Sequence, residues 1–315
     1  MTEGSKLIEV MEAREKRRND RRSFFKMAAT AAVAAPLILT LDGRPLHAQS
    51  APTDPDILNF ALNLEYLEAQ FYYFAFFGTG LPQNILSGTG TQGSVRGGRK
   101  VNFTDTKVSQ YAAEIAADER AHVEFLRGAL GGAAVAQPAI DISSDPDGAF
   151  SAAARAAGLI GAGQSFDPYA SDENFLLGAF IFEDVGVTAY KGAAPLINNK
   201  TFLEAAAGIL AVEAYHAALI RTTLYQKGIQ APTLINATER ISDARDSLDD
   251  PSDKDQGIAP RDNAANIGPF DGNGLAFSRS AADVLNIVYL TAAATSQGGF
   301  FPNGVNGTIR MSSAS

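Results

Sequence analysis

The sequence predicts an all-α protein: a four-helix bundle with one long crossover connection, followed by a loop-rich C-terminal extension. Both histidines that follow the first fifty residues end a Glu-x-x-His step, at Glu119–His122 and Glu213–His216. Each step lies in a long helical stretch, and a third and a fourth stretch place Glu65 and Glu183 upstream of the two steps. The order Glu, Glu-x-x-His, Glu, Glu-x-x-His is the ligand pattern of a dinuclear metal site inside a four-helix bundle.

Apolar residues recur with the helical period in four segments. The bundle helices are therefore expected at residues 55–77, 105–130, 172–194 and 200–228. Capping residues precede the second and third helices, and glycines punctuate three C-terminal ends. The candidate caps are Thr104 or Asp105 and Ser171 or Asp172, and the glycines are Gly78, Gly131 and Gly228.

The connections between these helices differ in length. Residues 131–171 are long enough for the single crossover of such a bundle and are expected to contain a short helix at 147–160. The Gly-rich residues 78–100 are longer than a hairpin between neighbouring helices needs, so they could form a lid over the site or a mobile loop.

The last third of the chain reads as an extension rather than as part of the bundle. Residues 229–278 have little apolar periodicity and many Asp, Asn, Gly and Pro residues, so we expect them to wrap the bundle surface. A fifth helix is expected at 280–294, where Ser280 begins the helix and Asp283 is placed for a capping interaction. The predicted domains are thus a bundle at 49–228 and an extension at 229–315.

The two Glu-x-x-His steps interrupt the apolar faces of their own helices. Residues three apart share a helix face, so each step directs a carboxylate and an imidazole to one place. The alternative is a pair of exposed Glu–His contacts, worth only about 0.2–0.5 kcal/mol each. The apolar flanks argue against exposure. Four buried carboxylates would repel one another and take up protons unless cations lay among them, and two divalent ions balance their charge.

The helical stretches also resemble a known family. NLEYLEAQFY, at residues 63–72, looks like the first ligand helix of the ferritin-like superfamily, and ADERAHVEFL, at 117–126, looks like the second. The resemblance covers roughly residues 56–228. Residues 279–307 resemble the C-terminal segment of exported ferritin-like proteins related to desiccation-associated proteins.

This resemblance implies a di-iron or di-manganese carboxylate site. Its implied ligands are Glu65, Glu119, His122, Glu183, Glu213 and His216. Glu119 and Glu213 would bridge the two ions, and Glu65 and Glu183 would each bind one. Carboxylate and imidazole ligands suit iron, manganese and zinc alike, so the pattern does not choose among these metals.

The first-helix ligand is open between two glutamates, because Glu68 stands three residues after Glu65 and shares its face. Glu65 precedes Tyr72 by seven residues, as Glu183 precedes Tyr190, and this repeat favours Glu65. Glu68 is then a group outside the ligand set, a ligand exchanged on oxidation, or a solvated carboxylate. Asp118 and Asp184 lie next to ligands but about 100° round the helix, so they are expected to be hydrogen-bond partners or exposed residues.

The N-terminus predicts export. Residues 20–26, DRRSFFK, form a twin-arginine motif, followed by the mildly apolar residues 27–41 and an A-x-A-like cleavage site at 46–48. The apolar stretch is too short for the roughly 20 residues of a membrane span, so a stable membrane anchor is not expected. Residues 1–48 are thus predicted to be a signal peptide recognised by the twin-arginine export machinery. We expect the mature protein in the periplasm or secreted.

Composition narrows the function classes. Residues 1–48 hold nine Lys and Arg against six Asp and Glu, which leaves a net charge of −12 for the remainder and argues against a nucleic-acid partner. The chain has no cysteine, so it is neither a lipoprotein nor stapled by disulfides.

Three functions remain. The first is a redox metalloprotein that reacts with oxygen or peroxide, by ferroxidase- or catalase-like turnover. The second is a non-catalytic envelope stress protein held together by its metals. The third is metal storage, which needs a cage. Metal ions and small oxidants are the expected ligands, and a homo-oligomer is possible.

Overall fold

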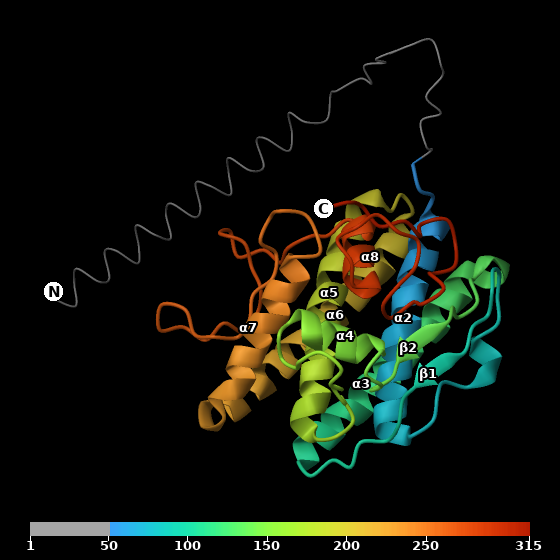
Figure 1. The fold of residues 1–315 in the computed structure, drawn as a ribbon. Helices are drawn as coiled ribbons and strands as arrows, with labels where there is room; N and C mark the ends of the chain where they lie inside the picture. Colours follow the sequence, from blue (N-terminus) through green and yellow to red (C-terminus); the bar gives the residue numbers. More distant parts are fainter. Residues whose placement is uncertain (1–50) are drawn as a thin grey trace. The chain divides into compact units, whose positions relative to one another are not determined.

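Four long helices form the bundle that the sequence predicts (Figure 1). The computed structural model describes residues 51–315, so the predicted signal peptide lies outside the described residues. The bundle helices are α2 (Asp54–Phe77), α3 (Thr106–Leu130), α5 (Asp172–Ala193) and α6 (Lys200–Gln230). Helix α2 packs along α3 and α5 packs along α6, while a smaller contact joins α2 to α5. The fold class is thereby confirmed.

Capping side chains and a glycine determine where the bundle helices begin and end. The Thr53 hydroxyl and the Asp56 carboxylate cap α2 reciprocally, Asp105 caps α3, and Ser171 caps α5. Gly78 ends α2 in the left-handed conformation, with φ 78°.

The predicted end of the fourth helix at Gly228 is wrong, because α6 continues to Gln230. A Cβ atom on Gly228 would lie 2.5 Å from Cγ1 of Ile235 in the next helix. This glycine therefore serves close helix packing and does not terminate the helix.

The two long connections meet in a small parallel sheet that the sequence does not signal. Strand β1 (Val95–Gly97) pairs with β2 (Ile140–Ile142), with Val95 opposite Ile140. The crossover also contains α4 (Ala149–Ala156), which is shorter than the expected helix at 147–160.

Residues 78–100 are tied to one flank of α2. The Tyr66 hydroxyl donates to the Ile85 carbonyl, and the Leu81 N–H donates to Gln70 Oε1. Tyr66 and Gln70 point roughly 100° and 140° away from Glu65 around the helix axis. The segment thus covers a side of α2 that faces away from Glu65, in place of the lid or mobile loop considered above.

The extension contains more helix than its composition suggests. Helix α7 (Pro232–Asp246) lies in the segment expected to wrap the bundle surface. The sequence did not indicate this helix, because its buried stripe is partly polar and includes Thr238, Ser242 and Arg245. Helix α8 (Ala281–Tyr289) begins with the expected Ser280–Asp283 capping box but is shorter than 280–294. Residues 270–275 form a separate turn in which the Asp271 N–H donates to the Leu275 carbonyl.

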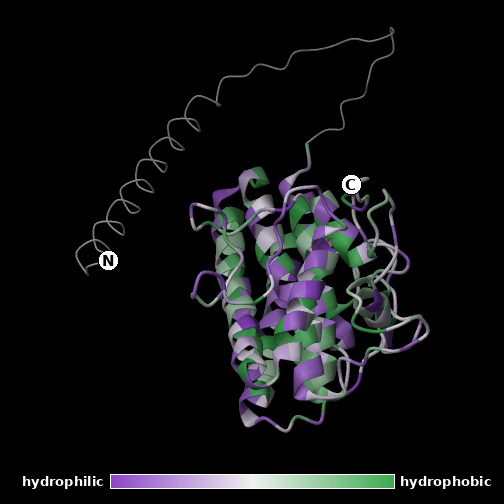
Figure 2. Cartoon of the chain, turned by 60° about the vertical axis from the view of Figure 1, so that its left-hand side comes forward, coloured by the Kyte–Doolittle hydropathy of each residue, from purple (hydrophilic) through white to green (hydrophobic). Residues whose placement is uncertain are grey.

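Hydrophobic and hydrophilic residues are interspersed along the bundle helices (Figure 2). Among the described residues, α6 is the one helix long and apolar enough to cross a membrane. A core helix of a bundle can pass the same test, and α6 buries two of the candidate metal ligands, Glu213 and His216.

Candidate metal centre

The structure brings all six predicted ligands together, from four different helices. Helix α2 supplies Glu65, α3 supplies Glu119 and His122, α5 supplies Glu183, and α6 supplies Glu213 and His216. The four glutamates are 0–1% exposed and the two histidines 8% and 5%. Each position is inward because the helical period returns it to the apolar face of its helix.

The first half of the cluster centres on the imidazole of His122. Its Nδ1 lies 3.2 Å from Glu65 Oε2, 3.7 Å from Glu213 Oε1 and 3.8 Å from Glu119 Oε2. One ligand atom from each of these four residues lies within 4.8 Å of the others, which is compatible with their binding one metal ion.

The second half centres on His216, whose Nδ1 lies 3.2 Å from Glu119 Oε1 and 3.7 Å from Glu183 Oε2. Glu119 thus turns one oxygen toward each imidazole. A bridging carboxylate needs this arrangement. The contacts of Glu213 reach only His122 among the two histidines, so the structure gives less support to a bridge at Glu213.

Two buried tyrosines cross between the halves. The Tyr72 hydroxyl on α2 donates to Glu183 on α5, and the Tyr190 hydroxyl on α5 donates to Glu65 on α2. The equal Glu-to-Tyr spacing noted in the sequence therefore becomes a reciprocal exchange between two helices. These hydrogen bonds orient the carboxylates predicted to be terminal ligands, a role that the sequence left unassigned.

The neighbouring aspartates have different partners. Asp118 is part-exposed and lies 3.2 Å from His216 Nε2, so it holds the ring whose Nδ1 faces the cluster. Asp184 is buried and accepts hydrogen bonds from Arg221 and Arg245. Both are hydrogen-bond partners, as their helical positions predicted.

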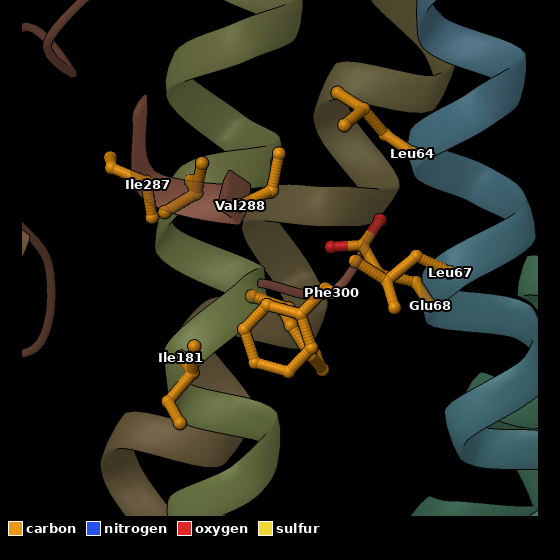
Figure 3. A pocket seen from close by; sticks show the side chains of 10 residues that line it. Leu64, Leu67, Glu68, Ile181, Ile287, Val288 and Phe300 are labelled. Atoms are coloured by element: carbon orange, nitrogen blue, oxygen red, sulfur yellow. The ribbon is translucent and has the colours of Figure 1, made fainter. Parts of the chain in front are cut away.

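Glu68 lies beside the cluster, where its Oε1 and Glu213 Oε2 both face Gly186 on α5. It projects from α2 toward α5, among Leu64, Leu67 and Phe300 (Figure 3). It is the one ionisable residue lining this small apolar pocket. Glu65 instead contacts both His122 and Tyr190, which favours Glu65 as the first-helix ligand.

Gly186 on α5 makes room for the cluster. A Cβ atom there would lie 2.3 Å from Glu213 Oε2, well inside van der Waals contact. No sequence pattern marked this glycine, because its role depends on α6 lying against α5.

The charges of the cluster change its proton affinity. Burial, opposed by the nearby His122, raises the pKa of Glu65 to about 7, and burial likewise raises the pKa of Glu183 to about 8 despite His216. Burial also favours the neutral form of Glu119, but the nearby imidazoles of His122 and His216 outweigh it and lower the pKa of Glu119 to about 2.

The two imidazoles respond in the opposite sense. Burial disfavours the imidazolium of His122, but Glu65 and Glu119 outweigh it and raise its pKa to about 11. Burial is likewise outweighed at His216 by Glu119 and Glu183, and its pKa rises to about 9. The carboxylates therefore recruit positive charge, as protons on histidine or as cations in their place.

Unpaired buried oxygens show that the donor set fits metal ions. Both oxygens of Glu119 and of Glu213, one oxygen of Glu183, and His216 Nδ1 are buried without a hydrogen-bond partner among the described residues. Such atoms are costly in a protein interior unless a ligand satisfies them. Oxygen and imidazole donors are ligands that divalent metal ions such as iron, manganese and zinc accept.

Comparison with known proteins agrees with this geometry. The family model for the ferritin-like domain matches residues 53–226, which span all six candidate ligands. The chain belongs to the ferritin-like family.

Two curated relatives extend the match beyond the bundle. A desiccation-related protein of Craterostigma plantagineum is 31% identical over 276 residues, covering 81% of this chain and 83% of the relative. A ferritin-like catalase of Nesocodon mauritianus is 30% identical over 272 residues, covering 81% and 84%. No solved structure matches the chain. This ferritin-like protein is thus related to desiccation proteins along most of its length.

Proposed function

We propose that this ferritin-like protein is an exported dinuclear iron or manganese protein that reacts with oxygen or peroxide in protection against stress. The observation that carries the proposal is the buried convergence of four glutamates and two histidines with unsatisfied ligand atoms. The relative named as a ferritin-like catalase supports peroxide as the oxidant.

Different residues of the chain have different roles in the proposed function. Glu65, Glu119, Glu183, Glu213, His122 and His216 would hold the two ions. Bound iron or manganese would supply Lewis acidity and electron transfer. Tyr72 and Tyr190 hold the carboxylates of Glu183 and Glu65 in place, and the apolar bundle around them excludes bulk water from the centre.

Metal analysis and turnover test this proposal together. We expect protein purified from the exported fraction to carry two equivalents of iron or manganese, and to release oxygen from hydrogen peroxide or to oxidise Fe(II). The Glu119→Ala variant is the control, because it removes the carboxylate that faces both imidazoles. It should lose activity in proportion to the metal it fails to bind. Wild-type metal content in Glu119→Ala would contradict the assigned site.

A second function is favoured by the desiccation-related relative. In it, the metals hold the bundle together without turnover. Two bound metals, a large fall in thermal stability on chelation, and no reaction with peroxide or Fe(II) would establish this function in place of the first. Storage would require a multi-subunit cage, which a mass measurement detects.

We propose export from the twin-arginine motif at residues 20–26, together with the apolar stretch and the cleavage site that follow it. Arg21→Lys combined with Arg22→Lys should trap the precursor in the cytoplasm, because the arginine pair is the signal that the twin-arginine machinery reads. Processed protein outside the cytoplasm at wild-type levels would show that another route carries it.

A further inference from the structure

A second cavity lies between α2 and residues 80–95, and none of the candidate metal ligands lines it. Its volume is about 520 Å³, within the range of small-molecule binding sites. None of its eleven lining residues is charged. Such a lining disfavours an ionic ligand, because a buried charge needs a partner.

Two buried glutamines form the polar part of the wall. Gln70 and Gln137 are each 1% exposed, and Gln70 Nε2 donates to Gln137 Oε1. Gln70 Oε1 also accepts from the Leu81 N–H, and Gln137 Nε2 donates to the Gly93 carbonyl. An amide offers two hydrogens and two acceptor sites, so each glutamine retains one of each for a ligand.

The outer wall adds further neutral hydrogen-bonding groups beside apolar surface. Gln83, Gln92 and Ser94 are exposed at the opening and make no side-chain hydrogen bond within residues 51–315. The ring of Phe74 and the side chain of Val95 contribute apolar surface. Amides together with an aromatic ring suit a ligand that alternates hydroxyl groups with C–H surface.

The sheet explains why the cavity is free of charge. Successive residues of a strand point to opposite faces, so Val95 lines the cavity and Arg96 turns away from it. The Arg96 guanidinium pairs with Asp141, Asp145 and Asp147, at 2.7–3.1 Å.

We propose that this cavity binds a neutral, hydroxyl-rich molecule of mono- or disaccharide size. The proposal does not depend on the metal centre or on the function proposed for it. Glucose and sucrose are suitable probes, and glucuronate is their charged counterpart because it differs from glucose by a carboxylate.

Saturation-transfer NMR titration of the intact protein tests the proposal. We expect saturable binding of glucose or sucrose, and at least tenfold weaker binding of glucuronate, whose charge would lie in a wall without a counter-ion. Absence of saturable binding of either sugar by about 100 mM, a hundredfold above a millimolar Kd, would overturn the proposal.

Variants then locate the bound sugar. Gln83→Ala with Gln92→Ala should weaken binding about tenfold or more, because each loses hydrogen bonds to the ligand. Ser94→Phe should abolish binding by filling the opening. The matched control is Gln110→Ala with Gln226→Ala, which removes two exposed glutamines of α3 and α6.

All these substitutions lie at exposed positions, so the midpoint of thermal unfolding and the metal content should not change. Binding that survives both the paired glutamine variant and Ser94→Phe would place the sugar elsewhere and refute the assignment.

Discussion

Gly186→Ala should damage the metal centre without removing any ligand. The added Cβ would lie 2.3 Å from Glu213 Oε2 and 3.2 Å from its carboxyl carbon. Ordinary van der Waals contact begins near 3.4 Å, so the Glu213 oxygen has to move by about 1 Å. Displacements of this size exceed the tolerance of about 0.5 Å that a ligand constellation allows.

The expected loss is about 10–100-fold in metal affinity, as for other changes that shift a ligand without deleting it. The fold itself should not suffer from the backbone change, because alanine in a helix interior is about 0.5–1 kcal/mol more favourable than glycine. The substitution therefore separates metal affinity from helix stability.

Metal titration and thermal unfolding of the metal-free protein measure the two effects. Gly208→Ala is the matched control, since Gly208 lies inside α6 and an added Cβ would meet no atom within 4 Å. It should gain the same helix stability and keep wild-type metal affinity. Two ions bound to Gly186→Ala with wild-type affinity would refute the placement of Glu213 against α5.

Three further predictions concern the same centre. The double variant His122→Ala/His216→Ala should lose bound metal by elemental analysis and unfold at a lower temperature than the metal-loaded wild type. Unchanged metal content would end the dinuclear assignment. In metal titrations, Glu65→Ala should lose one equivalent of bound metal. Glu68→Ala should still bind two metal ions at saturating concentration, with an affinity at most about 10–100-fold weaker. The reverse ranking would make Glu68 the ligand. The stability of the metal-free protein should fall between about pH 5 and 8, because the raised pKa values of Glu65 and Glu183 favour protons in the folded state that the unfolded chain releases near 4.5. The raised pKa values of His216 and His122 add stability that is lost as the pH rises from about 6.5 through about 9 for His216 and about 11 for His122. Metal affinity should rise with pH over the same range because binding displaces these protons. Thermal unfolding and metal titration at several pH values measure how stability and metal affinity depend on pH. A metal-free protein that becomes more stable toward pH 8 would contradict the expected loss of stability.

The sequence predicted those parts of the site that local geometry determines. A Glu-x-x-His step shares one helix face whatever surrounds it, so the spacing predicted that Glu119 lies with His122 and Glu213 with His216. The apolar residues that flank each step predicted that this face points inward. The helix caps at Ser171 and Ser280 could likewise be predicted from the sequence, because a capping side chain bonds to backbone two or three residues away.

Features that depend on contacts between distant elements could not be predicted from the sequence. The repeated Glu-to-Tyr spacing was visible, but it did not reveal that Tyr72 bonds to the glutamate of the other helix. The strands at 95–97 and 140–142 are three residues each, too short for any alternation to be recognised. Helix α7 was not predicted because its buried face is partly polar: Arg245 on that face donates hydrogen bonds to the Phe180 carbonyl and to Asp184 on α5.

Those partners explain why the extension matters to the bundle. Arg221 on α6 and Arg245 on α7 both donate to Asp184, the residue next to Glu183. Arg245 and Arg279 in turn pair with Asp255.

A buried charge that loses its partner costs several kcal/mol, so each member of this network stabilises the charges that it contacts. The segment after α7 is therefore a structural support for α5. It supports the helix that presents Glu183, and the position of this candidate ligand consequently depends on residues more than sixty positions further along the chain.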